Sequence, residues 1–321
     1  MNHSYNDIIS IKNLCEAWRE FVRGKKFRRD VMEFSLNLSE NIIRLHEDLK
    51  NRTYQHSVYK AFSINDPKPR SIHKAEVRDR LLHHAIYRIL YPYFDKKFIY
   101  DSYSCRNFKG THRPLFRLSQ FFRQVSRGNK VTCWVLKCDV KKFFANIDHN
   151  LLRYIVTKHV GDKDINRLIN QIISSFQTSP GKGLPLGNLT SQLLVNVYMN
   201  EFDQYVKHTL KVKYYIRYAD DFVLIASDRK YLTLLLPRLQ QFLLKQLKLS
   251  LHPDKVFIKT FASGVDFLGW VHFPNHRVLR TTTKRRMLKN LSSNPSKETI
   301  ASYRGLLKHG DTYKLQEILF K

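Results

Sequence analysis

The order of apolar and polar residues predicts a chain of amphipathic helices interrupted by short strands. In the predicted helices, apolar residues recur at the spacing of one helix face, whereas the predicted strands are short runs rich in β-branched and aromatic residues. Pro92 is expected to stop or kink the helix that contains it. The predicted helices cover residues 5–50 with a basic break at 24–29, then 75–100, 114–127, 151–178, 193–206, 231–249 and the region from 280 onward. The predicted extended segments lie within residues 54–72, 131–140, 214–227, 249–260 and 265–273.

The segment from Tyr214 to Ser227 reads YYIRYADDFVLIAS and predicts a β-hairpin. Two β-prone runs flank a polar centre that contains Asp220 and Asp221. Neighbouring carboxylates repel each other, and a divalent cation offsets that repulsion by taking oxygen ligands. The centre is therefore either a metal-binding tip or a solvated Asp-Asp turn, and the hairpin alone does not decide between them.

A further acidic residue lies near the end of another apolar strand. Residues 131–140 form an apolar, β-prone run with Asp139 close to its C-terminal end. A carboxylate in that place is costly unless it is paired or binds a metal. Asp148, which precedes a predicted helix, is expected to be an N-cap and not a catalyst. Three carboxylates from two adjacent strands can hold two Mg²⁺ ions about 3.5–4 Å apart.

Composition favours a globular protein that binds a polyanion. The chain has 321 residues, 43% of them hydrophobic, and its 56 Lys and Arg against 27 Asp and Glu give a formal charge of +29. Nucleic acid is the first expected partner and an anionic membrane surface the second, with a generically basic protein as the remaining alternative. Phe and Tyr are interleaved with the basic residues, which suits a groove that follows a phosphate backbone.

Other sequence signals argue against zinc, disulfide and membrane classes. The four cysteines form no CxxC pair, so neither a zinc site nor a disulfide framework is expected, and a reducing cytoplasm fits. His83 and His84 are adjacent, and neighbours on a helix do not face one site, so core or groove positions are expected for them. No apolar run reaches about 18 residues and the N-terminus lacks a signal-peptide pattern, so a cytoplasmic protein without a membrane partner is expected.

Five sequence motifs follow one another in the order found in reverse transcriptases, and the chain resembles that family over nearly its whole length. Residues 137–144 resemble motif A, residues 183–192 (GLPLGNLTSQ) motif B, residues 218–221 (YADD) motif C, residues 249–255 motif D and residues 267–270 (FLGW) motif E.

The resemblance implies an α+β fold of the right-hand polymerase type, with fingers, a palm built on an antiparallel sheet and a helical thumb. The implied parts are an N-terminal helical extension at 1–53, fingers at 54–131, palm at 132–148, a connection between fingers and palm at 149–186, palm again at 187–273 and a short helical thumb at 274–321.

The resemblance also implies roles for individual residues. Asp139, Asp220 and Asp221 are expected to be the catalytic metal ligands, with Val140 beside them, for two Mg²⁺ ions that Mn²⁺ can replace. The implied nucleotide-binding residues are Lys68, Arg70, Phe144, Leu186 and Gln192. Contacts to template or primer are implied for Arg80, Arg106, Asn188, Ser191, Tyr218, Leu268 and Gly269.

Some of these implied roles have a physical reason and an open alternative. The ring of Phe144 is expected to occupy the space of a ribose 2′-OH, so that dNTPs are selected over NTPs; plain core packing is the alternative. Lys68 and Arg70 suit the incoming triphosphate because charge-assisted bonds to phosphate are strong. Lys255 is a candidate general acid for the leaving pyrophosphate, and a simple surface lysine is the alternative.

Within the family, the chain most resembles the enzymes of diversity-generating retroelements. This likeness rests on GLPLGNLTSQ, on DPKPRSI at residues 66–72 and on DSYSCRNFKGTH at residues 101–112. Leu186 stands where most processive relatives have Gln, and Ala219 where many have Met or Val. Because an apolar side chain cannot hydrogen-bond near the nascent base pair, Leu186 implies relaxed base selection, especially opposite template adenine.

The expected activity is therefore synthesis of DNA from dNTPs on an RNA template, with an RNA or DNA primer. A small helical accessory protein or a non-coding RNA is a further expected partner. The length of the chain, without an endonuclease or ribonuclease H extension, disfavours a full group II intron protein. Two alternatives stay open: an anti-phage defence reverse transcriptase that acts on a dedicated non-coding RNA, and an inactive RNA-binding protein that retains the fold.

Overall fold

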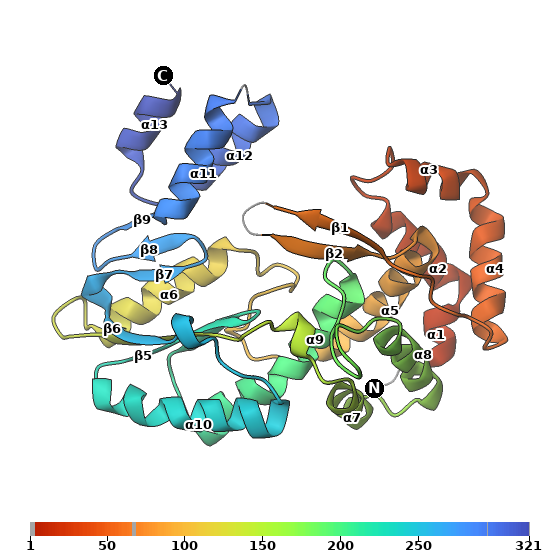
Figure 1. The fold of residues 1–321 in the computed structure, drawn as a ribbon, viewed down its shortest axis with the longest axis horizontal. Helices are drawn as coiled ribbons and strands as arrows, with labels where there is room; N and C mark the ends of the chain where they lie inside the picture. The colour runs from red at the N-terminus through yellow and green to blue at the C-terminus, as the bar shows by residue number, and fades with distance from the viewer. Residues whose placement is uncertain (1–3, 66–68, 294, 321) are drawn as a thin grey trace. The chain divides into compact units, whose positions relative to one another are not determined.

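Two units make up the computed structural model, which describes residues 4–65, 69–293 and 295–320 (Figure 1). Each unit draws on several stretches of the chain. The first contains residues 1–100, 140–205 and 241–250, and the second contains residues 101–139, 206–240 and 251–321. None of the described helices is long and apolar enough to cross a lipid bilayer.

The first unit is mainly helical. Helix α5 lies at its centre and contacts α2 and α9, and its buried residues include Leu81, Leu82 and Ala85. Helix α2 buries Leu14, Ala17, Trp18 and Phe21, the spacing of one helix face, which explains why this stretch folds as an amphipathic helix. The elements of the first unit are α1 (Tyr5–Ile9), α2 (Ile11–Phe21), α3 (Arg29–Leu36), α4 (Leu38–Lys50), β1 (Lys60–Ile64), β2 (Arg70–Lys74), α5 (Val77–Asp95), η1 (Phe144–Asn146), α7 (His149–His159), α8 (Lys163–Ser174) and α9 (Leu189–Gln204).

Several predicted boundaries in the first unit were wrong. The helical region 5–50 is divided into four helices, and the region 151–178 into two, because Asp162 caps a new helix by accepting from the amides of Asp164 and Ile165. Helix α5 does not stop at Pro92 but continues to Asp95. Pro92 lies in the last turn of the helix. It removes one amide hydrogen bond there, and only a few helical residues follow it.

The second unit contains two antiparallel sheets. The larger sheet has the strand order β4-β5-β3-β6, and the smaller has the order β7-β8-β9. The hairpin predicted at 214–227 is confirmed as β4 and β5, whereas β9 was missed by the sequence analysis. The elements of the second unit are α6 (His112–Val125), β3 (Trp134–Asp139), β4 (Tyr215–Tyr218), β5 (Asp221–Ala226), η3 (Pro253–Lys255), β6 (Phe257–Thr260), η4 (Phe261–Ser263), β7 (Val265–Phe267), β8 (Trp270–His272), β9 (Arg277–Leu279), α11 (Thr281–Ser292), α12 (Lys297–Leu307) and α13 (Tyr313–Phe320).

Two helices cross the division between the units. The π-helical turn η2 (Tyr205–Thr209) begins at the last residue of a first-unit stretch, and α10 (Arg229–Leu247) passes from the second unit to the first at Gln241. The predicted division into extension, fingers, palm and thumb is a finer one than these two units and stays a prediction.

One face of the larger sheet changes from apolar to charged along its strands. Val135 and Ile225 are opposite each other in the sheet and belong to a buried cluster with Phe122 of α6. Side chains two residues apart in a strand share a face, so Asp139 and Asp221 continue the face that begins with Val135 and Ile225. The apolar end anchors the strands to α6, and the other end of the same face presents carboxylates.

The N-cap predicted at Asp148 is confirmed. Its Oδ1 accepts from the amide of Leu151 at 2.9 Å, and its Oδ2 accepts from Lys248 Nζ at 2.7 Å. Burial raises the pKa of Asp148, but the hydrogen bonds from Lys248 and Leu151 outweigh that effect and leave the pKa below its usual value.

Asp148→Ala is expected to lower the free energy of unfolding by roughly 1–2 kcal/mol at neutral pH, because the cap of α7 is lost. A lowered folded-state pKa gives stabilisation that is present above the usual carboxyl pKa and is lost as pH falls through the folded-state value. The difference between wild type and variant in urea unfolding should therefore shrink in acid. Asp148→Asn keeps an acceptor for the cap and should lose less; an equal deficit at every pH would contradict this account.

Candidate active site

The register of the larger sheet brings two acidic residues side by side. Asp139, the last residue of β3, is the direct partner of Asp221, the first residue of β5. Directly opposite residues in an antiparallel pair have Cβ atoms about 4.5–5.5 Å apart. Asp220 precedes Asp221 in the turn that joins β4 to β5. The backbone thus gathers three acidic residues at one end of the sheet.

The electrostatics of this end are dominated by burial. Burial is the main reason that the pKa of the Asp221 carboxyl rises to about 7; Lys137 opposes the rise, and the charges of Asp139 and Asp220 add to it. Because burial and the neighbouring carboxylates disfavour the charged form of Asp221, a further positive charge nearby would stabilise its carboxylate.

Two lysines already contact the carboxylates. Lys255 Nζ lies 2.8 Å from Asp139 Oδ1, and Lys137 Nζ lies 3.0 Å from Asp221 Oδ2. Lys255 is placed by the short turn η3, and the adjoining His252 donates its amide to the carbonyl of Asp139 at 2.7 Å. Lys255 was predicted from the sequence, whereas Lys137, a lysine inside an otherwise apolar strand, was not.

The donor set fits a hard cation. Within residues 4–65, 69–293 and 295–320, Asp221 Oδ1 is a buried oxygen without a hydrogen-bond partner. Carboxylate oxygens are the ligands that Mg²⁺ prefers. In the same described ranges no three His, Cys, Asp or Glu side chains are grouped as a metal site requires. Asp139 and Asp221 instead contact Lys255 and Lys137, so a cation shared by the two carboxylates would have to compete with these ammonium groups.

The tip of the β4–β5 hairpin has a strained backbone at Ala219 and is supported by the buried side chain of Arg217. Ala219 has φ +55°, a conformation that residues with a Cβ rarely adopt. Its carbonyl accepts from Arg217 Nη1 at 3.0 Å, while Arg217 Nη2 donates to Ser102 Oγ at 3.0 Å. Arg106 in turn donates to the carbonyl of Ser102 at 2.8 Å. The segment after Asp101 therefore supports the tip, and Arg106 has a structural contact beside its predicted template role.

In the first unit, the loop at residues 179–188, rich in glycine and proline and here called the Gly/Pro loop, is joined to strand β2. The amide of His73 donates to the carbonyl of Leu186 at 3.1 Å, and Asn188 Nδ2 donates to the carbonyl of His73 at 3.1 Å. Gly183 has φ +104°, and a Cβ there would lie 2.5 Å from Thr178 Oγ1, so the loop requires glycine at this position. The amide of Leu184 donates to the carbonyl of Phe144 at 2.9 Å, which ties the loop to the predicted steric gate.

A cavity of about 380 Å³ in the first unit is lined by several of the predicted residues. It is lined by Arg80, Asn188 and Gln192 together with basic and aromatic side chains. In the described part of the chain, three of its lining residues carry a buried polar atom without a partner: Arg80 Nε, His83 Nδ1 and Asn188 Oδ1. The remaining lining residues are Phe21, Lys25, Arg28, Phe62, Ile72, Lys74, His84, Gly187 and Leu189.

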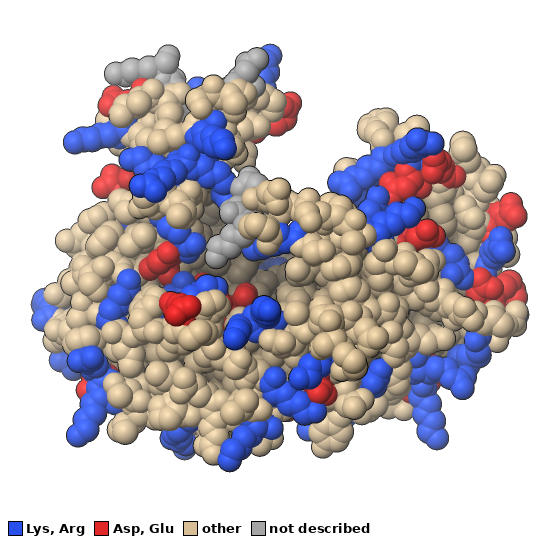
Figure 2. Space-filling model, in the orientation of Figure 1, with Lys and Arg blue, Asp and Glu red and all other residues tan. Residues whose placement is uncertain are grey.

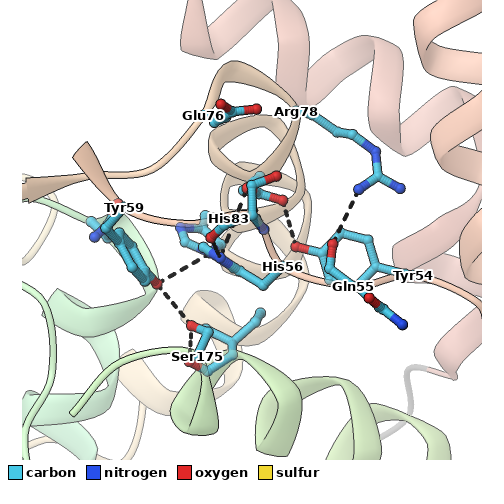
Figure 3. Close-up of polar contacts among 12 residues, drawn as sticks. Tyr54, Gln55, His56, Tyr59, Glu76, Arg78, His83 and Ser175 are labelled. Atoms are coloured by element: carbon cyan, nitrogen blue, oxygen red, sulfur yellow. Dashed lines mark hydrogen bonds and ion pairs between the residues drawn. The ribbon is translucent and has the colours of Figure 1, made fainter.

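A partly buried polar network includes His83, which also lines this cavity (Figure 3). His56 Nε2 is 3.2 Å from both His83 Nε2 and the hydroxyl of Tyr59, and that hydroxyl is 2.9 Å from Ser175 Oγ. Burial is the main reason that the pKa of His83 lies well below its usual value. His83 is therefore a buried histidine and His84 a cavity-lining one, as expected for core and groove positions.

The remaining predicted residues divide between the two units. Tyr218, Leu268 and Gly269 belong to the second unit with the acidic residues, and Leu268 and Gly269 form the turn between β7 and β8. Val140, Arg70 and Ser191 belong to the first unit, where Arg70 is exposed and Ser191 is buried. Lys68 lies outside the described residues.

Comparison with known proteins identifies the family. Residues 64–272 match the family described as reverse transcriptase (RNA-dependent DNA polymerase). The chain belongs to the reverse transcriptase family. The matched range includes β3, both strands of the hairpin and the Gly/Pro loop.

Individual relatives of this chain are distant in sequence. Protein YkfC of Escherichia coli is 25% identical over 260 residues, covering 69% of this chain and 66% of YkfC. The group II intron-encoded protein LtrA of Lactococcus lactis is 22% identical over 318 residues, covering 77% of this chain and 51% of LtrA. The match thus spans slightly less than two thirds of one relative and about half of the other.

Solved structures bear on the fold. The apo telomerase of Candida tropicalis, truncated from its C-terminal domain, superposes with a TM-score of 0.51 at 12% identity, covering 75% of this chain and 60% of that one. The α+β polymerase fold expected from the sequence is confirmed.

Strain at the tip of the β4–β5 hairpin can be measured. Ala219→Gly is expected to leave stability unchanged or raise it by up to about 1 kcal/mol in urea unfolding, because glycine adopts positive φ freely. Ala219→Val should lower stability, since a β-branched side chain fits this backbone worst. Ala226→Gly, in extended backbone of β5, is the matched control and should cost roughly 0.5–1 kcal/mol. A loss of stability in Ala219→Gly as large as that in the control would refute strain at Ala219.

Proposed function

We propose that the protein is an RNA-directed DNA polymerase that copies an RNA template into cDNA by two-metal nucleotidyl transfer. The observation that carries this proposal is the pairing of Asp139 with Asp221, with Asp220 in the adjoining turn, inside the range that matches the reverse transcriptase family.

Asp139, Asp220 and Asp221, with the main chain of Val140, would hold two Mg²⁺ ions, or Mn²⁺ in their place. Such ions lower the pKa of a primer 3′-OH and neutralise charge on the phosphates. The unpartnered Oδ1 of Asp221 and its raised pKa support a cation here. Lys255, whose Nζ contacts Asp139, is proposed to donate a proton to the leaving pyrophosphate.

Residues of the first unit are proposed to bind the nucleotide and the template. Lys68 and Arg70 would contact the triphosphate, and Phe144 would exclude a ribose 2′-OH. The cavity lined by Arg80, Asn188 and Gln192 offers unsatisfied donors and acceptors beside basic side chains, which suits RNA. Leu186, which is partly exposed, is proposed to belong to this surface, whereas the buried Ser191 is proposed to brace the loop.

The C-terminal helices are proposed to hold the duplex of template and primer. Figure 2 shows Lys and Arg side chains on the visible face of this helical module. Its exposed basic residues include Lys284, Arg285, Lys289, Arg304 and Lys308. A positively charged surface of this kind binds phosphate backbones without reading sequence. Tyr218, Leu268 and Gly269 would contact the primer end.

The biological role that we propose is mutagenic copying within a diversity-generating retroelement, with a small helical accessory protein as partner. The resemblance of residues 101–112 and 183–192 to those enzymes supports it. The named relatives, a group II intron protein and YkfC, do not distinguish this role from an anti-phage defence enzyme with its own non-coding RNA. Genomic neighbours separate the two: a repeat pair beside an accessory gene, or a defence island.

Primer extension with Mg²⁺, dNTPs and an RNA template tests the activity. Wild type is expected to extend the primer, while Asp220→Ala and Asp139→Asn should lose at least about 10³-fold in rate, because electrostatic stabilisation of the reacting phosphates is lost. Lys130→Ala, an exposed basic residue of the second unit, is the control and should stay active. Should wild type be as inactive as Asp220→Ala, the chain is an RNA-binding protein that retains the fold.

The proposed low fidelity rests on Leu186. Leu186→Gln is expected to lower misincorporation opposite template adenine several-fold, because a glutamine amide can hydrogen-bond near the nascent pair and an apolar side chain cannot. Sequencing of cDNA made on one RNA template by both proteins measures this. Equal error rates would remove the proposed role of Leu186 without touching the polymerase assignment.

A further inference from the structure

Lys137 is a buried lysine of β3, one of the two central strands of the larger sheet. It lies two residues before Asp139 on β3, and its side chain is only 11% exposed. Its direct partner on β5 is Val223, and Asp221 lies two residues from Val223 on the same face. Lys137 and Asp221 are therefore diagonal neighbours across the two strands, within reach for a long side chain.

The contact between them is a largely buried ion pair. Lys137 Nζ is 3.0 Å from Asp221 Oδ2, and the Asp221 side chain is 19% exposed. A buried ammonium group is costly unless a carboxylate compensates it, and truncating one member of such a pair leaves the other uncompensated. Lys137 thus lies between the apolar end of this sheet face, at Val135, and its acidic end, at Asp139 and Asp221.

Lys255 differs from Lys137 in its exposure to solvent and in the element that carries it. The Lys255 side chain is 41% exposed and approaches Asp139 from the turn η3, so it can leave the carboxylate at little cost. Lys137 is fixed in the central pair of strands and has far less solvent around it. The two lysines leave Asp221 Oδ1 without a partner within the described residues.

We propose that Lys137 is a positioning residue for the metal site: an internal counter-ion that holds Asp221 in place before a divalent cation arrives, and that competes with the cation for that carboxylate. This inference rests on the proposed function. It predicts opposite effects on two quantities when the charge is removed. Stability without metal falls, because Asp221 loses its partner. Affinity for the cation rises, because a nearby positive charge no longer opposes it.

The experiment compares wild type with Lys137→Met, which keeps the aliphatic length and removes the charge. Urea unfolding in EDTA should show a lower midpoint for the variant. Titration with Mn²⁺, followed calorimetrically in the absence of nucleic acid and dNTPs, should show a dissociation constant on the order of tenfold lower. Lys137→Arg keeps the charge and should return both values toward wild type.

A matched control comes from the neighbouring strand. Lys259 is a partly buried lysine of β6, in register with Val135, and should not change Mn²⁺ affinity when replaced by Met. If Lys137→Met does not fold, Lys137→Gln, which retains a hydrogen-bond donor for Asp221, should give the same tighter binding.

The outcomes separate the inference from the proposed function. Reduced stability with unchanged or weaker Mn²⁺ binding makes Lys137 a structural residue and overturns the inference, as does unchanged stability. If wild type binds Mn²⁺ and Asp139→Asn abolishes that binding, the proposed metal site stands whatever Lys137→Met does. If wild type does not bind Mn²⁺, the metal site and the inference both fail.

Discussion

The structure depends on the antiparallel pairing of β3 with β5. This register sets Asp139 directly opposite Asp221 and leaves two like charges in a poorly solvated place. Such an arrangement is unfavourable by itself and persists only when positive charge is supplied. Lys137 and Lys255 supply it in the described chain, and a pair of divalent cations would supply more.

The rest of the second unit holds this unfavourable pair in place. At the far end of the same sheet face, Val135 and Ile225 join the apolar cluster beneath α6. At the near end, buried Arg217 links the carbonyl of Ala219 to Ser102 and so fixes a tip whose backbone is strained. Strain and uncompensated charge concentrate at functional sites, where surrounding packing offsets their cost.

The sequence predicted what is local and missed what depends on register. The hairpin around Asp220 and the N-cap at Asp148 follow from short patterns of residue types, and both are present. The contact of Lys137 with Asp221 is not visible in the sequence, because it arises from pairing strands far apart in the chain. The same holds for the bonds between His73 and the Gly/Pro loop. Pro92 does not stop its helix, one of the two effects expected of it, because it lies in the last turn.

The central claim is that Asp139, Asp220 and Asp221 share divalent cations. Anomalous X-ray scattering from crystals grown with Mn²⁺ and a template–primer duplex tests it most directly. The account predicts two anomalous peaks about 3.5–4 Å apart, each at coordination distance from carboxylate oxygens of Asp139 and at least one of the other two residues. Anomalous peaks elsewhere would contradict the account. So would a structure with no peak beside the carboxylates, in which Lys137 still contacts Asp221 and Lys255 still contacts Asp139.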